Sequence, residues 1–159
     1  MKQPIREKRH RLIPELYVGE RVVSFTGCVK YRKKLFTNLE IFLKMEEFLL
    51  SSMMKHQCDA YIYLFMPNHF HFILTGNNEK SSIKKCIDLF KQKSGFYISQ
   101  NQKGYRWQKD YYDHILRQHE NLIANIKYIL NNPVRAGIVD YWKDYKFMGS
   151  TIYNLDNWE

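Results

Sequence analysis

Hydrophobic residues recur along this chain with two periods, one typical of strands and one typical of helices. Residues 21–29 (RVVSFTGCV) are β-branched and aromatic and predict a strand. Residues 38–57 carry apolar side chains three and four positions apart, which predicts an amphipathic helix with Asn38 as its N-cap. Residues 59–76 (DAYIYLFMPNHFHFILTG) return to a β-rich pattern that is interrupted by Pro-Asn, a turn signal, and they predict a β-hairpin.

The second half of the chain continues the same alternation. Residues 81–100 have apolar side chains on one helical face and predict a second helix. Residues 105–116 (YRWQKDYYDHIL) are aromatic and predict one or two short strands. A third helix is expected from about residue 120 to 131, ending before Pro133, because a residue that precedes proline is pushed out of the helical region. The segment after Pro133 has only a weak pattern.

The predicted order of elements is β-α-β-β-α-β-α, with the two central strands adjacent in sequence. This order predicts an α+β fold in which helices pack on an antiparallel β-sheet, of the ferredoxin-like kind. The sequence has no internal repeat and no linker rich in Pro, Gly or Ser. We therefore expect a single domain over residues 1–159, in which residues 1–15 form a basic and mobile leader.

Composition adds a class of partner to this fold. The 159 residues carry a formal charge of +9, and 16% of them are aromatic. A hydrophobic content of 45% excludes wholesale disorder. A basic surface favours polyanions, and exposed aromatic rings can stack on unpaired bases. In the alternative interpretation the rings fill the core of a β-rich domain and the lysines keep it soluble.

Sequence features also bear on the compartment. No apolar run approaches the roughly 20 residues that cross a bilayer, so we expect no membrane association. The basic N-terminus lacks the apolar segment of a secretory signal. Cys28, Cys58 and Cys86 are odd in number and widely spaced, which indicates reduced core thiols in a cytoplasmic protein.

Two histidines, His69 and His71, stand two residues apart on the second strand of the predicted hairpin. Alternate residues of a strand share a face, so both imidazoles point the same way and form half of a metal site. Phe70 and Phe72 then fall on the opposite face, which is a core face. A lone His-x-His pattern is nevertheless common by chance, and structural histidines remain the alternative.

An unusual group of side chains lies on one flank of the third predicted helix. Asn121, Asn125, Tyr128 and Asn132 gather there, where a solvated face would normally carry Lys and Glu. Tyr128 and Asn132 are four residues apart and should project together. If this flank faced the histidines, a phenol and an amide oxygen would join the site. From spacing alone, a half-buried tyrosine at a helix–sheet seam is the favoured interpretation.

Two stretches resemble a known family. The segment MPNHFHFIL resembles the HUH motif of single-tyrosine transposases, and RWQKDYYDHILRQHENLIANIKYILNNPVRAGIV resembles the C-terminal signature of the REP-associated tyrosine transposases, a branch of the insertion-sequence-200-like superfamily. The resemblance runs from about residue 22 to 151. Its motifs, MPNHxH, WQxxYYDHxxR and YIxxNPVRAG, are specific in combination and order.

The resemblance implies a fold, an activity and a set of site residues. It implies an HUH endonuclease that nicks and rejoins single-stranded or hairpin DNA through a 5′-phosphotyrosine. His69 and His71 would bind Mg²⁺ or Mn²⁺, Tyr128 would be the nucleophile, and Asn132 would complete the metal site. Homodimers are typical of the wider superfamily, whereas REP-associated members can act as monomers.

Basic residues supply candidate phosphate contacts. Arg32, Lys33 and Lys34 follow the first strand. Lys84, Lys85, Lys91 and Lys93 lie on the second predicted helix, and Arg135 follows the end of the third. These positions could contact DNA. For the lysines the alternative is solubility, and for Arg135 it is a helix-end contact.

Two other functional classes are compatible with the same residues. The first is a non-catalytic module that binds single-stranded nucleic acid, because the predicted sheet is similar to that of an RNA-recognition domain. That module would need exposed aromatic side chains where this sequence has two histidines. The second is a metallohydrolase with a metal-bound water, which would need an added Asp or Glu ligand near the histidines. His114, a polar residue within an aromatic segment, is expected to be a hydrogen-bonded structural residue.

Overall fold

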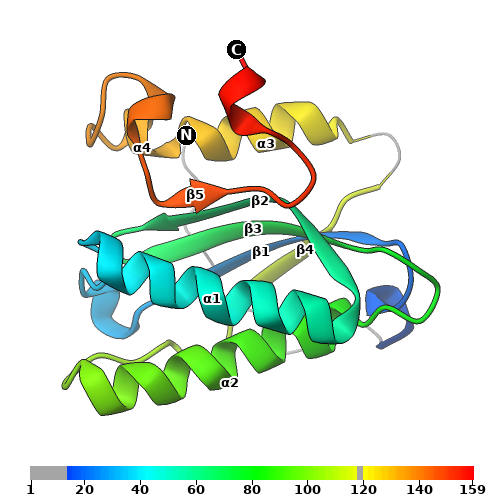
Figure 1. The fold of residues 1–159 in the computed structure, drawn as a ribbon, viewed down its shortest axis with the longest axis horizontal. Helices are drawn as coiled ribbons and strands as arrows, with labels where there is room; N and C mark the ends of the chain where they lie inside the picture. The colour runs from blue at the N-terminus through cyan, green and yellow to red at the C-terminus, as the bar shows by residue number, and fades with distance from the viewer. Residues whose placement is uncertain (1–13, 118–119) are drawn as a thin grey trace.

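The computed structural model describes residues 14–117 and 120–159, and within them the expected order β1-α1-β2-β3-α2-β4-α3 is followed by a short helix α4 and a last strand β5 (Figure 1). Of the leader expected over residues 1–15, only residues 14 and 15 lie within the described part. The strands are β1 (Val22–Cys28), β2 (Cys58–Met66), β3 (His69–Gly76), β4 (Tyr112–Ile115) and β5 (Met148–Gly149). The helices are α1 (Leu39–His56), α2 (Ile83–Asn101), α3 (Leu122–Leu130) and α4 (Asn132–Arg135).

The strands form one antiparallel sheet in the order β4-β1-β3-β2-β5. Helices α1 and α2 lie side by side on one face of the sheet, and α3 and α4 lie on the other (Figure 1). The predicted α+β class is therefore confirmed, with helices covering both faces.

The larger core lies between the sheet and the α1–α2 layer. Its centre is a group of aromatic rings in which Phe70 and Phe72 stack with centroids 4.1 Å apart, and Phe65 meets Phe72 edge-on at 5.4 Å. All three side chains are fully buried. Trp107 closes the group and donates from Nε1 to Ser94 Oγ at 2.8 Å, so its one polar atom is satisfied.

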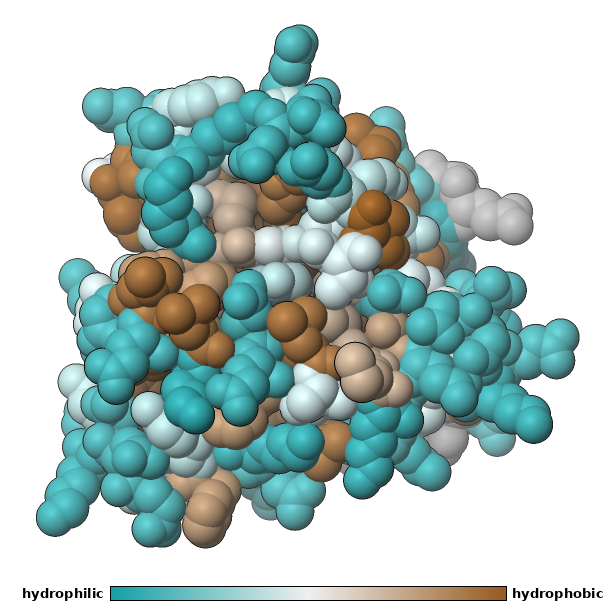
Figure 2. Space-filling model, in the orientation of Figure 1, coloured by the Kyte–Doolittle hydropathy of each residue, from teal (hydrophilic) through white to brown (hydrophobic). Residues whose placement is uncertain are grey.

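A smaller core lies on the opposite face, under α3. It combines residues of the sheet, of α3 and of the C-terminal segment: Ile62, Leu64, Met66, Ile73, Ile126, Ile129, Leu130, Trp142 and Tyr145. Because β2 and β3 send alternate side chains to the two cores, the same strands hold both helical layers in place. In the view of Figure 2, which includes both helical layers, hydrophilic side chains cover most of the surface and apolar side chains form separate patches.

Side-chain caps fix where the helices begin. The Asn38 carboxamide accepts from Ile41 N at 3.0 Å, which confirms the predicted N-cap of α1. Ser82 caps α2 in the same way, so that helix begins at Ile83.

No helix of the described residues is both long and apolar enough to span a bilayer.

The end of α3 agrees with the prediction to within one residue, but the backbone after it does not behave as expected. The helix ends at Leu130, but the chain does not leave the helical region at Pro133, because α4 begins at Asn132 and contains that proline in its first turn. Proline is tolerated there since the first-turn N–H groups have no intrahelical acceptor. The expected end of the third helix before Pro133 is therefore confirmed, whereas the expectation that proline pushes Asn132 out of the helical region was wrong.

The segment after Pro133, which has only a weak sequence pattern, adds the edge strand β5 to β2. Phe65 N donates to Phe147 O at 2.8 Å. Glycine is required at position 149, because a Cβ there would lie 2.2 Å from the Tyr63 hydroxyl. That hydroxyl donates to Glu46 Oε2 at 2.7 Å, and burial together with this hydrogen bond raises the pKa of Tyr63.

The three cysteines are buried thiols, as expected.

Candidate functional site

The His69 and His71 side chains lie on the face of β3 that α3 covers, as the strand alternation predicts. Their rings are adjacent and perpendicular, with centroids 4.9 Å apart. Both are half-buried, whereas Phe70 and Phe72 between and beyond them are fully buried on the other face. The expectation that the histidines occupy the face opposite the aromatic core is therefore confirmed.

Each imidazole is oriented through its Nδ1 atom. His69 Nδ1 lies 2.6 Å from the Asn68 Oδ1 atom, which can only accept, so Nδ1–H donates there. His71 Nδ1 lies 3.0 Å from Thr26 Oγ1. A hydrogen bond at Nδ1 fixes the ring orientation, and in the tautomer in which Nδ1 donates, Nε2 is the atom suited to bind a metal. Both rings are thus held in the manner of metal-ligating histidines.

Thr26 and Asn68 were not predicted as site residues. A weak signal exists for each: Thr26 is one of two hydroxyl residues in a largely apolar strand, and Asn68 belongs to the turn that joins β2 to β3. Strand register places Thr26 between His71 on β3 and Tyr112 on β4. The polar part of this sheet face therefore extends across three strands.

Tyr128 lies near the end of α3, and its side chain is 58% exposed. The Arg135 guanidinium, from α4, lies over the phenol ring at 3.7 Å from the centroid. Arg135 Nη2 also donates to the Tyr128 carbonyl oxygen at 2.6 Å. One arginine therefore holds both the ring and the backbone of this tyrosine, and it joins α4 to the end of α3.

Asn132 and Tyr128 differ in their surroundings. Asn132 is only 6% exposed and begins α4, after the break at Asn131. Because the two residues belong to separate helices, the spacing of four does not place them on one continuous helical face. Asn121 has a local role, since its side chain accepts from Ala124 N and caps α3. The unusual group of asparagines is thus partly a capping feature.

All four predicted site residues belong to the same side of the sheet. Ile126, Ile129 and Leu130 of α3 pack in the smaller core with Leu64 and Met66, the β2 residues paired with His71 and His69. The C-terminal end of α3, helix α4 and the β2–β3 connection all lie at the left end of the molecule in Figure 1. Within the described residues, no hydrogen bond joins the Tyr128 hydroxyl to either histidine.

The donor set suits a divalent cation in part. Among the described residues, no three His, Cys, Asp or Glu side chains gather as a metal site. Two oriented imidazoles are nevertheless present, and the buried amide of Asn132 is a hard neutral oxygen donor on the same side of the sheet. Mn²⁺ accepts such a mixed set more readily than Mg²⁺, which prefers oxygen ligands.

The basic residues after β1 lie at the histidine end of the sheet. Val29 N donates to Asn68 O at 2.9 Å, and Leu35 N and Phe36 N donate to Pro67 O at 2.8 and 3.0 Å. The segment between them, with the exposed side chains of Arg32, Lys33 and Lys34, is therefore held against the β2–β3 turn.

The lysines of α2 occupy the opposite layer, and most of them have structural partners. Lys84 pairs with Asp88, and Lys91 Nζ donates to Gln108 O at 2.8 Å. Lys93 Nζ donates to Ser51 Oγ at 3.2 Å. The structure thus separates these predicted phosphate contacts into one group beside the histidines and another on α2, on the opposite face of the sheet.

His114 Nε2 lies 2.9 Å from a Glu120 oxygen, which confirms a hydrogen-bonded role.

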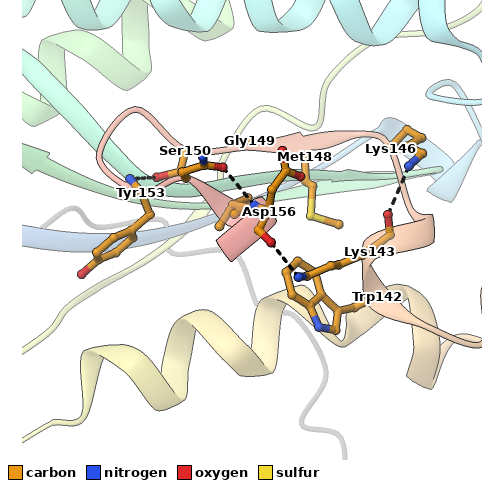
Figure 3. A pocket seen from close by; sticks show the side chains of 10 residues that line it. Trp142, Lys143, Lys146, Met148, Gly149, Ser150, Tyr153 and Asp156 are labelled. Carbon is orange, nitrogen blue, oxygen red and sulfur yellow. Dashed lines mark hydrogen bonds between the residues drawn. The ribbon is translucent and has the colours of Figure 1, made fainter. Parts of the chain in front are cut away.

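Two pockets lie elsewhere. One, of about 280 Å³, is formed by the C-terminal segment, where Lys143 Nζ donates to Asp156 O at 2.9 Å and Trp142 and Tyr153 line the wall (Figure 3). The other, of about 520 Å³, lies between the start of β1 and the start of α3. None of the predicted site residues lines either pocket.

The sequence and the fold are both similar to those of known proteins. Residues 21–132 match the family model described as "Transposase IS200 like". A Haemophilus influenzae protein assigned as a REP-associated tyrosine transposase is 26% identical over 109 residues, which span 58% of this chain and 62% of that protein. The region matched by the family model includes the strand pair that carries His69 and His71.

Two solved structures share the fold. The structure of a REP-associated tyrosine transposase bound to a REP hairpin has a TM-score of 0.73 at 19% identity and covers 89% of this chain and 81% of that one. A protein of Deinococcus radiodurans R1, assigned as a transposase, has a TM-score of 0.53 at 18% identity and covers 79% of this chain and 96% of that one.

Proposed function

The chain belongs to the family of IS200-like transposases, and on this premise we propose that it nicks and rejoins single-stranded DNA with Tyr128 as the nucleophile. The observation that carries the proposal is the pair of half-buried imidazoles, His69 and His71, each held through Nδ1 on the sheet face that α3 covers. Two neighbouring imidazoles that are each oriented through Nδ1 have the arrangement typical of metal-ligating histidines.

In the proposed reaction the Tyr128 oxygen attacks the scissile phosphorus. A phosphotyrosine bond forms to the 5′ phosphate, the bond to the 3′ oxygen breaks, and the proton lost by the phenol is balanced by the one that the leaving 3′ oxygen gains to become a 3′-hydroxyl. The phosphotyrosine conserves the energy of the phosphodiester, so a second 3′-hydroxyl can reverse the step on another end without a nucleotide cofactor. Arg135 would keep the phenol ring in place through its stacking contact.

His69, His71 and Asn132 are the residues that would hold the cation, Mg²⁺ or Mn²⁺. When bound, such a cation neutralises charge on the scissile phosphate, which matters because a phenol is almost fully protonated at neutral pH. Thr26 and Asn68 would orient the two imidazoles at 3.0 and 2.6 Å. The cleavage rate should therefore depend on the metal concentration.

The substrate we propose is single-stranded or hairpin DNA. The related structure with a TM-score of 0.73 is that of a protein bound to a REP hairpin, and the basic segment after β1 lies at the histidine end of this sheet.

We place the protein in the cytoplasm, where three buried thiols stay reduced. The homodimer remains a prediction, which sedimentation equilibrium of the full chain tests.

The two alternative functions make different demands on the structure. A module of the RNA-recognition kind needs aromatic side chains on an open sheet face, but helices cover both faces here. A metallohydrolase needs a carboxylate ligand, and none of the described Asp or Glu residues joins the histidines in a group of three. The observations therefore favour the transposase chemistry.

Incubation of the protein with end-labelled DNA tests the proposal. The substrate is a hairpin with single-stranded flanks, incubated with Mn²⁺ and then resolved on a denaturing gel. We expect a free 3′-hydroxyl fragment together with a protein-linked fragment that carries the label of the 3′ side. Cleavage that yields only free fragments would favour the metallohydrolase, and binding with no cleavage would favour the non-catalytic module.

A further inference from the structure

The turn after β1 displays one aromatic ring prominently. Tyr31 lies in this turn, and its side chain is 73% exposed, more than that of any other aromatic residue among the exposed large hydrophobics of the described chain. Tyr31 and the following Arg32 have φ angles of 62° and 55°, in the left-handed region. Residues other than glycine rarely adopt this conformation, least of all two in succession.

The backbone around the turn maintains this conformation. Lys30 N donates to Arg106 O at 2.8 Å and Arg32 N donates to Val29 O at 3.0 Å. Together with the bond from Val29 N to Asn68 O, these contacts fix the turn on both sides of Tyr31. Strained residues that the surrounding structure holds in this way are concentrated at binding and catalytic sites. The backbone that carries the exposed ring is thus fixed, although the ring itself is not packed.

One residue, Asn68, connects the turn to the proposed catalytic face. Its backbone oxygen accepts from Val29 N, and its Nδ2 lies 3.5 Å from Arg32 O. Its Oδ1 lies 2.6 Å from His69 Nδ1. The Tyr31 turn and the first imidazole therefore share a single hydrogen-bonding residue, which sets their relative position.

The charges around Tyr31 suit a nucleic-acid strand. The ring is flanked in sequence by Lys30 on one side and by Arg32, Lys33 and Lys34 on the other. Lys30 Nζ lies 5.4 Å from the ring centroid, within the range of a cation–π contact. An exposed ring among cations is the arrangement by which proteins bind single strands, since the ring stacks on a base while the cations contact phosphates.

We propose that Tyr31 is a stacking platform for one unpaired base of the DNA strand that reaches the His69–His71 end of the sheet. The proposal rests on the function proposed above and adds a contact that positions the strand next to the reacting phosphate. Stacking of this kind tolerates any base, because every base has a π-face. Tyr31 would therefore contribute affinity for single strands and little sequence preference.

Binding of a fluorescein-labelled single-stranded DNA of mixed sequence to the full chain, measured by anisotropy without added metal, tests the proposal. Asn tolerates positive φ, so Tyr31→Asn removes the ring and keeps the turn. We expect a roughly 5- to 100-fold loss of affinity for Tyr31→Asn and near wild-type affinity for Tyr31→Trp. The matched control is Phe96→Ala, which removes a 70% exposed ring from α2, on the face of the sheet opposite to His69 and His71, and should leave affinity unchanged.

The melting temperature separates loss of contact from loss of fold. Because Asn is less strained than Tyr at this position, Tyr31→Asn should melt at or above the wild-type temperature while binding more weakly. If Tyr31→Asn and Phe96→Ala bound the DNA with equal affinity while the wild type still formed the covalent adduct, Tyr31 would not be a stacking platform. The proposed function would still stand. Failure of the wild type to bind or cleave single-stranded DNA would overturn both.

Discussion

The two faces of strand β3 show how one segment serves two purposes. Phe70 and Phe72 point toward α1 and α2, are fully buried and stack on each other. His69 and His71 point toward α3, are half-buried and hydrogen-bond to polar neighbours. Because the side chains alternate, the aromatic face fixes the strand rigidly while the other face presents the imidazoles. A site carried by a strand with such a core behind it is held more precisely than a site on a loop.

The largest effect is expected on the imidazole face. His69→Ala and His71→Ala should each reduce metal-dependent cleavage by roughly a thousandfold, since a metal contributes several kcal/mol to the stabilisation of transition-state charge. Thermal melting should change little, because neither ring belongs to a hydrophobic core. Gel-based cleavage rates and Mn²⁺ titration by calorimetry check this. Unchanged Mn²⁺ affinity in both variants would make the histidines structural.

The aromatic face should show the opposite behaviour. Phe72→Ala leaves a cavity among Phe65, Phe70 and Phe90, so we expect the free energy of unfolding to fall by about 3–5 kcal/mol. Urea denaturation measures this loss. Tyr141→Ala, which removes a 49% exposed ring, is the control and should cost far less. Equal losses for the two variants would show that the aromatic core does not dominate stability.

A smaller effect is expected at Thr26, which orients His71 but would not itself bind the metal. Thr26→Val removes the hydroxyl that lies 3.0 Å from His71 Nδ1 and keeps the shape of the side chain. We expect Mn²⁺ affinity to fall about 10- to 100-fold, the usual cost of losing a residue that orients a ligand. Thr26→Ser keeps the hydroxyl and should retain affinity. If Thr26→Ser fell as far as Thr26→Val, packing rather than the hydrogen bond would explain the loss.

The smallest effect concerns surface charge. Lys34 lies at the histidine end of the sheet, and Lys85 lies on α2, on the opposite face; both side chains are exposed. The two variants compared are Lys34→Gln and Lys85→Gln. If Lys34 contacts a phosphate, its loss should reduce the slope of log affinity against log salt by about 1, whereas Lys85→Gln should not. Salt titrations of single-stranded DNA binding measure both slopes. A larger change for Lys85→Gln would place the DNA on the α1–α2 layer instead.

Much of the fold was readable because its signals are local. Asn38 as a cap, the helical spacing in α1 and α2, and the turn at Pro67–Asn68 each depend on a few neighbouring residues. The same holds for His69 and His71, whose common face follows from strand alternation. Strand β5 lacked such a signal: Met148 and Gly149 pair with β2 only because the chain returns to it over a long loop.

The missed parts of the candidate site depend on contacts between distant segments. Thr26 lies 45 positions from His71 in sequence and meets it only through the register of β1 and β3. The division between the α2 lysines and the basic turn after β1 follows from which face each helix covers, which spacing within one helix does not determine. Tyr128 and Asn132 were expected to project together, but a break at Asn131 separates them into two helices.

The central claim is that Tyr128 forms the covalent link to DNA, and Tyr128→Phe tests it most directly. The change removes one hydroxyl from a 58% exposed side chain and keeps the ring under Arg135, so fold and DNA binding should persist. Wild type and variant are incubated with hairpin DNA and Mn²⁺, denatured in SDS, and digested for mass spectrometry. We predict a DNA-linked peptide at Tyr128 in the wild type and no adduct in the variant. An SDS-resistant adduct in Tyr128→Phe would contradict the account and assign the nucleophile to another of the 12 tyrosines.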